Sequence, residues 1–400
     1  MKKYYLLHLL SRTIFGIYYS CSIVNMISDG MTIQQACLAS FCLCLGVSVF
    51  EIPFGFIADK FGRKLSVLGG LTAHCIGFGV FAYSTALFPV SMACIAFGMT
   101  LISGADKAWY VSQLELLPDR KITTETLFLN LSLVERGAMV IGAFVGPYFM
   151  ARNPPMVWGI TSLVAFVALT YGSFLPDHHK LNEKKNKNVV SPKLDWNSLL
   201  NGASVSFFVL LFSNFFFGFA EGSKGLVIQP YIMGISSGYV GILTIHQLLC
   251  VAFRFSGIMF YKKVLQAYAK GPQFVALSTF IMFLSSVVAL STQSYLVFIM
   301  FFGLAIFALG WGEPLMDSTI NDKITNSKLK ATYFSMNSMF TNVGEALSLL
   351  YLSFVLTKED MTLGWGMAAI GFLVSVVVFS GAVVLRKREL GVVQEASIAK

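Results

Sequence analysis

The chain has 400 residues, of which 56% are hydrophobic and only 12% are charged, and its mean hydropathy is +0.71. Soluble domains are close to half apolar and about a quarter charged, so this composition excludes an ordinary water-soluble protein. The formal net charge of +9 does not indicate nucleic-acid binding, because the basic residues gather in loops between apolar runs. The composition therefore predicts an all-α integral membrane protein with many spanning helices.

Six apolar runs, each near the ~20 residues that cross a bilayer, fill the first part of the chain. The spans are expected at Tyr5–Ile27, Ile33–Ile57, Leu65–Tyr83, Phe88–Leu114, Thr123–Met150 and Pro155–Leu175. The first run carries His8 and Arg12 and no small-residue cleavage site follows it, which favours a retained span over a signal peptide. Residues 1–175 are therefore predicted to form one six-helix bundle.

A polar, lysine-rich stretch at residues 176–197 is predicted to be a cytoplasmic linker, and residues 198–400 a second six-helix bundle with a short cytoplasmic tail. Its spans are expected at Phe208–Ile232, Tyr239–Phe260, Pro272–Leu290, Tyr295–Leu315, Lys330–Leu356 and Leu363–Leu385. A faint internal repeat with an offset of 206 residues places Gly16 on Gly222. This offset aligns the first span with the seventh, as two related halves require.

The basic residues predict the orientation of the chain. With the N-terminus in the cytoplasm, the cytoplasmic segments hold 22 of the 29 Lys and Arg residues, and only Arg152 and Lys358 fall outside. This asymmetry predicts that both termini are cytoplasmic, in a multi-pass protein of a bacterial-type cytoplasmic (inner) membrane. The seven cysteines lie within apolar runs and are expected to be free packing residues.

Ionisable side chains inside spans cost at least ~2.5 kcal/mol each on insertion scales, so by default they indicate function. The candidates for substrate binding or proton coupling are Glu221, Lys224, Asp106, Lys107, Glu313, Glu135, Arg136 and Arg12. Glu221 and Lys224 are three residues apart and therefore share a helix face. Burial favours a protonated carboxyl group and a nearby cation favours the ionised form, so breaking such a pair can couple proton transfer to conformational change. Static ion pairs that fix helix packing are the alternative explanation.

A polar hairpin between the second and third spans reads Gly55-Phe-Ile-Ala-Asp59-Lys60-Phe-Gly62-Arg63-Lys64. It resembles the loop between helices 2 and 3 of the major facilitator superfamily, which reads roughly G-x-L-A-D-[RK]-x-G-R-[RK]. The resemblance implies about twelve spanning helices in two six-helix halves that rock around a central site. It also implies a cytoplasmic gate formed by Gly55, Asp59, Gly62, Arg63 and Lys64.

The fifth span contains Gly142-Ala-Phe-Val-Gly146-Pro147, which resembles the core of the fifth-helix motif in exporters of the same superfamily. This resemblance favours export over uptake. The fourth-helix arginine of those exporters falls on Thr100 here. Asp106 and Lys107, or Arg136, would therefore have to replace it in a proton pathway.

These features predict a secondary active transporter that moves a small amphipathic molecule by alternating access, with proton-coupled efflux as the first hypothesis. Proton-coupled uptake of a small nutrient or metabolite is the alternative, and a non-transporting membrane receptor or scaffold on the same fold is a hypothesis of another class. The sequence has no HExxH motif and no P-loop, which argues against an enzyme or an ATP-driven pump. The expected partners are a small-molecule substrate and the lipid bilayer, with no nucleic acid, no metal and no cofactor beyond the proton gradient, and the chain is expected to be a monomer.

Overall fold

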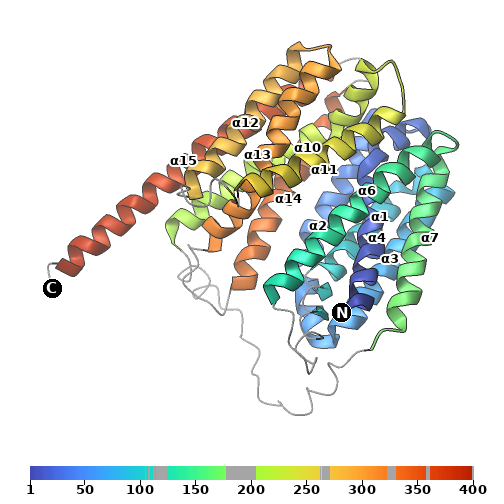
Figure 1. Ribbon diagram of the computed structural model, residues 1–400, viewed down its shortest axis with the longest axis horizontal. Helices are drawn as coiled ribbons and strands as arrows, with labels where there is room; N and C mark the ends of the chain where they lie inside the picture. The colour runs from blue at the N-terminus through green and yellow to red at the C-terminus, as the bar shows by residue number, and fades with distance from the viewer. Residues whose placement is uncertain are drawn as a thin grey trace. The chain divides into compact units, whose positions relative to one another are not determined.

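A computed structural model gives the architecture of the chain (Figure 1). The structure describes residues 1–103, 105, 106, 109, 110, 113, 124–176, 204–261, 263, 271–321, 330–356 and 361–398. Within these residues the first helices are α1 (Lys2–Ser28), α2 (Ile33–Phe61), α3 (Arg63–Tyr83), the 3₁₀ turn η1 (Thr85–Leu87), α4 (Phe88–Ile102), α6 (Thr124–Met150) and α7 (Pro154–Ser173). They are followed by α10 (Val205–Ile235), α11 (Gly241–Phe260), α12 (Gly271–Ser291), α13 (Tyr295–Asn321), α14 (Lys330–Val355) and α15 (Thr362–Ile398).

The described residues thus form twelve α-helices and contain no strand, which confirms the predicted all-α class. Ten of the helices are long and apolar enough to cross a membrane. The other two, α1 and α14, have 27 and 26 residues and carry more polar side chains. Polar residues in a span are tolerated where neighbouring helices cover them, and most of α1 is buried.

Two helices differ from the predicted spans. The fourth span was expected to run without a break from Phe88 to Leu114, but α4 ends at Ile102 and Ser103 has an extended backbone with ψ 122°. Helical residues resume at Ala105 and Asp106. The Ser-Gly dipeptide after this apolar run is a turn signal, but the span was predicted from hydropathy, which does not register it. At the other end, α15 continues as a helix to Ile398, beyond the predicted end of its span, because the charged residues that follow are good helix formers.

The chain divides into two compact units. Unit 1 comprises Met1–Ser191 and Ile232–Val251, and unit 2 comprises Pro192–Tyr231 and Ala252–Lys400. In unit 1, α1 packs along α6 and α7, and α3 packs against α4 and α7 (Figure 1). In unit 2, α12 packs between α13 and α15. The seven cysteines, all among the described residues, are not joined in disulfides.

Glycines allow α1 and α6 to approach until their backbones touch. A Cβ atom added at Gly142 would lie 2.0 Å from the carbonyl carbon of Gly16, and one added at Gly146 would lie 2.1 Å from the Ser20 hydroxyl oxygen. Because an adjoining side chain would force the helices apart, only glycine fits at these positions. Two of the three residues of the fifth-helix motif therefore form the seam between α1 and α6.

Unit 2 contains a corresponding seam between α10 and α14. A Cβ atom added at Gly16 would contact Met139, and one added at Gly222 would contact Glu345. Gly16 and Gly222 differ by 206 positions, and so do Met139 and Glu345. The contacts within each unit thus follow the offset of the faint sequence repeat, which gives the repeat a structural basis.

Candidate functional site

One face of α1 carries polar side chains at intervals of four residues. Tyr4, His8 and Arg12 lie one helical turn apart and therefore point to the same side of the helix. His8 is fully buried, Tyr4 is 7% exposed, and the Arg12 side chain is 19% exposed. This face is directed at the segment that follows the interruption of the fourth span, where Asp106, Trp109, Tyr110 and Gln113 lie.

Asp106 is the centre of a buried polar cluster, which we call the Asp106 cluster and define as Asp106, Arg12, His8 and Tyr110. Asp106 is only 1% exposed. Arg12 Nη2 donates a hydrogen bond of 2.7 Å to Asp106 Oδ2. His8 Nδ1 lies 3.5 Å from the same oxygen, and the His8 ring meets the Tyr110 ring edge-on with centroids 5.8 Å apart. A buried carboxylate thus has one close cation and one titratable neighbour.

Further contacts beside the Asp106 cluster join α1 to the segment of the fourth span that carries Asp106. The Tyr4 hydroxyl donates a hydrogen bond of 2.9 Å to Gln113 Oε1, and the Tyr4 ring packs edge-on against Trp109 at 5.5 Å. Arg12 also has an attractive electrostatic interaction with Glu135 of α6. Arg12 is therefore paired with the carboxylate of Asp106 and attracted by a second carboxylate, Glu135, on another helix.

The sequence analysis selected Arg12, Asp106 and Glu135 as candidates but did not predict that Arg12 interacts with the other two. It expected Asp106 and Lys107, or Arg136, to take over from the missing fourth-helix arginine, whereas the structure pairs Asp106 with Arg12 of α1. Lys107 lies outside the described residues, and Arg136 is half-buried on α6. Sequence reasoning also gave no site role to Tyr4 and His8, although their spacing of four from Arg12 was a usable signal for a shared polar face.

In unit 2, the predicted neighbours Glu221 and Lys224 form an ion pair on α10. Lys224 Nζ lies 2.6 Å and 2.7 Å from the two Glu221 carboxylate oxygens. The Lys224 side chain is 8% exposed and its ammonium group lies 5.8 Å and 5.9 Å from the ring centroids of Phe302 and Phe372. The Glu221 side chain is 29% exposed, so the carboxylate is the more accessible end of the pair.

Glu313 of α13 pairs with Arg254 of α11 inside unit 2. The Glu313 side chain is 47% exposed and that of Arg254 is 27% exposed. Ion pairs with this exposure contribute little stability. Among the candidate carboxylates, Glu313 is thus far more exposed than Asp106.

The structure describes part of the hairpin between α2 and α3. Gly55 and Asp59 lie in the last part of α2, where the described residues do not include side chains. Gly62 has φ +105°, a left-handed conformation that favours glycine, and it directly precedes α3. Lys64 Nζ donates hydrogen bonds of 2.9 Å and 2.5 Å to the backbone carbonyls of Ser173 and Leu175. A cation at the C-terminus of α7 satisfies carbonyl groups that have no helical partner.

Lys64→Gln is expected to lower the thermal unfolding temperature slightly, because it removes a charged cap from the end of α7. A cation near an exposed helix C-terminus typically contributes about 0.3–1 kcal/mol, so the loss should stay within that range. The measurement is thermal unfolding of the purified protein in detergent. Lys3→Gln is the matched control, at an exposed lysine on α1. Equal unfolding temperatures for the two variants would contradict a capping role for Lys64.

The remaining element of the fifth-helix motif, Pro147, lies inside α6, which continues to Met150. Beside it, Thr244 Oγ1 of α11 donates a hydrogen bond of 2.7 Å to the carbonyl oxygen of Ala143. Because the motif glycines contact α1 on one side and this hydrogen bond joins α11, the end of α6 is a junction of three helices.

The sequence profile described as Major Facilitator Superfamily matches residues 4–348. The chain belongs to this superfamily. This agrees with the twelve helices, the repeat-related seams and the charged groups inside spans. The chain is therefore a membrane transporter of the superfamily type. This confirms the family that the hairpin at Gly55–Lys64 resembles.

Superfamily relatives from bacteria align over much of the chain. The uncharacterized transporter BU466 of Buchnera aphidicola is 26% identical over 288 residues, which cover 70% of each protein. The uncharacterized MFS-type transporter YxaM of Bacillus subtilis is 22% identical and covers 95% of each protein. Among solved structures, a variant of the nucleoside transporter NupG matches with a TM-score of 0.79 at 14% identity, covering 95% of this chain and 98% of NupG. At this identity the match demonstrates a common fold.

Proposed function

We propose that this chain exports a small amphipathic molecule in exchange for protons, and that the Asp106 cluster is its proton-binding site. The observation that carries the proposal is the nearly complete burial of Asp106 beside both Arg12 and His8. A buried carboxylate in a transporter is retained at a substantial energetic cost, which is expected when its charge is used in the transport cycle.

The chemistry of the cluster suits reversible protonation. While Asp106 is ionised, its charge is balanced by Arg12 at 2.7 Å. When Asp106 takes up a proton, Arg12 loses its attraction to that carboxylate. The attraction between Arg12 and Glu135 then becomes the larger of the two. Because Arg12 belongs to α1, Asp106 to the fourth span and Glu135 to α6, the protonation state changes how three helices of unit 1 are held together. Such a charge switch can bias alternating access.

Glu221 and Lys224 are the proposed contact with the substrate. Lys224 is buried against two phenylalanine rings while Glu221 is more accessible, so a ligand can reach the carboxylate without exposing the lysine. An accessible carboxylate next to aromatic rings suits an amphipathic molecule with a polar or cationic group. We place the protein in a bacterial-type cytoplasmic membrane as a monomer with both termini inside.

The direction of transport has one competing assignment. The Gly142–Pro147 motif resembles that of exporters and supports efflux. Uptake is the alternative. The fold matches the nucleoside transporter NupG and a peptide transporter named POT at TM-scores of 0.79 and 0.72, and these matches favour neither direction. Both matches are only 14% identical. The experiment is therefore designed so that the two directions of coupling give signals of opposite sign.

The test uses liposomes that contain the purified protein and a pH-sensitive dye, to which a panel of amphipathic compounds is added from outside. Antiport predicts that the interior becomes more alkaline as the compound enters and protons leave, whereas symport predicts that it becomes more acidic. Asp106→Asn is expected to reduce the signal to that of protein-free liposomes. Asp29→Asn, the same change in the turn after α1, should leave the signal unchanged.

The outcomes separate the hypotheses. Acidification would replace efflux by proton-coupled uptake. A signal of normal size in Asp106→Asn would contradict the assignment of the proton site. Compound binding with no proton movement, unchanged by Glu221→Gln or Asp106→Asn, would favour a non-transporting receptor on the same fold.

A further inference from the structure

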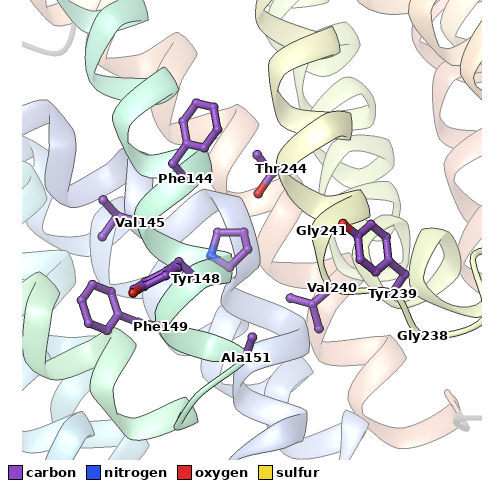
Figure 2. A pocket seen from close by; sticks show the side chains of 11 residues that line it. Phe144, Val145, Tyr148, Phe149, Ala151, Gly238, Tyr239, Val240, Gly241 and Thr244 are labelled. Carbon is purple, nitrogen blue, oxygen red and sulfur yellow. The ribbon is translucent and has the colours of Figure 1, made fainter.

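An apolar groove lies in unit 1 where α6 ends and α11 begins (Figure 2). Its volume is about 770 Å³, within the range typical of ligand pockets. Its lining consists of Phe144, Val145, Pro147, Tyr148, Phe149, Ala151, Gly238, Tyr239, Val240, Gly241 and Thr244. Figure 2 shows the lining residues at the end of α6 on one side and those at and just before the start of α11 on the other. The groove is separate from the Asp106 cluster, and no step of the proposed function uses it.

The walls of the groove are open and almost free of polar groups. Phe144, Tyr148 and Tyr239 are 55%, 51% and 65% exposed, so large apolar surfaces of this groove are left uncovered. The hydroxyl of Thr244, one of the lining residues, already donates its hydrogen bond to the carbonyl oxygen of Ala143. The groove therefore suits a hydrocarbon chain and offers little to a polar solute.

A cation, Arg152, lies beside one wall of the groove. The Arg152 guanidinium carbon lies 3.9 Å from the centroid of the Tyr148 ring, and Tyr148 lines the groove. Among the described residues no carboxylate pairs with Arg152. Arg152 is exposed in the turn between α6 and α7, at the level where spans meet water. An apolar groove thus ends at an accessible positive charge.

We propose that this groove binds one anionic phospholipid, with an acyl chain between α6 and α11 and its phosphate at Arg152. The groove and the cation match the two ends of such a lipid. Arginine forms paired hydrogen bonds with phosphate oxygens, and basic groups beside spanning helices recognise anionic headgroups. Tyr148 and Tyr239 add aromatic rings at the depth where interfacial tyrosines are enriched. The charge distribution of the chain predicts that this end faces the outer leaflet.

The bound lipid would stabilise the junction beside it. The hydrogen bond from Thr244 to Ala143 joins α11 to α6 next to the groove, so an acyl chain that fills the space holds the same two helix ends. Occupancy should therefore raise the thermal unfolding temperature. This readout does not depend on the transported compound or on the direction of transport.

The experiment measures lipid retention by native mass spectrometry after delipidation and addition of either phosphatidylglycerol or phosphatidylcholine. The wild type is expected to keep one phosphatidylglycerol and to unfold at a higher temperature with it. Arg152→Gln should reduce the preference for phosphatidylglycerol over phosphatidylcholine about fivefold, the effect of one basic residue at a membrane surface. Val240→Trp, which fills the groove, should abolish retention of both lipids.

Lys358→Gln is the matched control, since the sequence places Lys358 on the same side of the membrane as Arg152. This variant should retain phosphatidylglycerol as the wild type does. The proposal is overturned if Arg152→Gln and Val240→Trp both retain the lipid normally, or if Lys358→Gln loses it to the same extent as Arg152→Gln. If Val240→Trp does not fold, the comparison of Arg152→Gln with Lys358→Gln still tests whether Arg152 binds the lipid phosphate.

Discussion

Gly142→Ala is expected to destabilise the protein strongly, because the new methyl group would lie 2.0 Å from the backbone of Gly16. A backbone atom cannot move aside as a flexible side chain does, so α1 and α6 must separate. Overpacking of this kind typically costs about 1–3 kcal/mol and occasionally more. The measurement is the thermal unfolding temperature in detergent, together with the yield of folded protein.

Gly137→Ala on the same helix is the matched control, because a methyl group there meets no atom within 4 Å. Alanine has a helix propensity about 1 kcal/mol better than glycine, so this variant should be as stable as the wild type or more stable. The same substitution is thus expected to lower the stability at Gly142 and to maintain or raise it at Gly137. If Gly142→Ala were as stable as Gly137→Ala, the close seam between α1 and α6 would be wrong.

The second large effect is expected at the pair of Arg12 and Asp106. Arg12→Gln leaves a carboxylate that is 1% exposed without its cation, and breaking a buried pair in this way costs about 3–5 kcal/mol. Asp106→Asn should cost less, since the Arg12 side chain is 19% exposed and still has Glu135 as a neighbour. The double variant should recover part of the loss, and the free energy of unfolding measured for all four proteins gives the coupling.

Lowering the pH should also reduce the loss of stability in Arg12→Gln, because protonation removes the buried negative charge of Asp106. His8, Tyr110 and Glu135 face the same cluster and are left intact in every variant. Equal destabilisation in Arg12→Gln and Asp106→Asn, with no coupling in the double variant, would contradict the pairing seen in the structure.

These predictions depend on features that the sequence revealed to different degrees. Hydropathy located most spans well: α11 ends at Phe260 and the apolar part of α15 ends at Leu385, both as predicted. The sequence predicted that Glu221 and Lys224 share a helix face from their spacing of three residues, and the structure shows them as an ion pair. Such features depend on the period of one helix and need no knowledge of neighbouring helices.

The Asp106 cluster could not be assembled in the same way. Arg12 and Asp106 are 94 residues apart, and their contact depends on which face of α1 meets the fourth span. The interruption at Ser103 directly precedes the segment that carries Asp106, and its Ser-Gly turn signal does not indicate which helix face Asp106 meets. Long-range pairing between helices is set by packing, which a single sequence specifies only weakly.

The assignment of proton binding to Asp106 is tested most directly by difference infrared spectroscopy of the protein in lipid during a pH titration. This measurement needs no transported compound. The account predicts a component of the protonated carboxylic acid absorption that grows as the pH falls, is missing in Asp106→Asn, and persists in Glu221→Gln. A band that is unchanged in Asp106→Asn would show that the proton binds elsewhere and would reduce the Arg12–Asp106 pair to a structural contact.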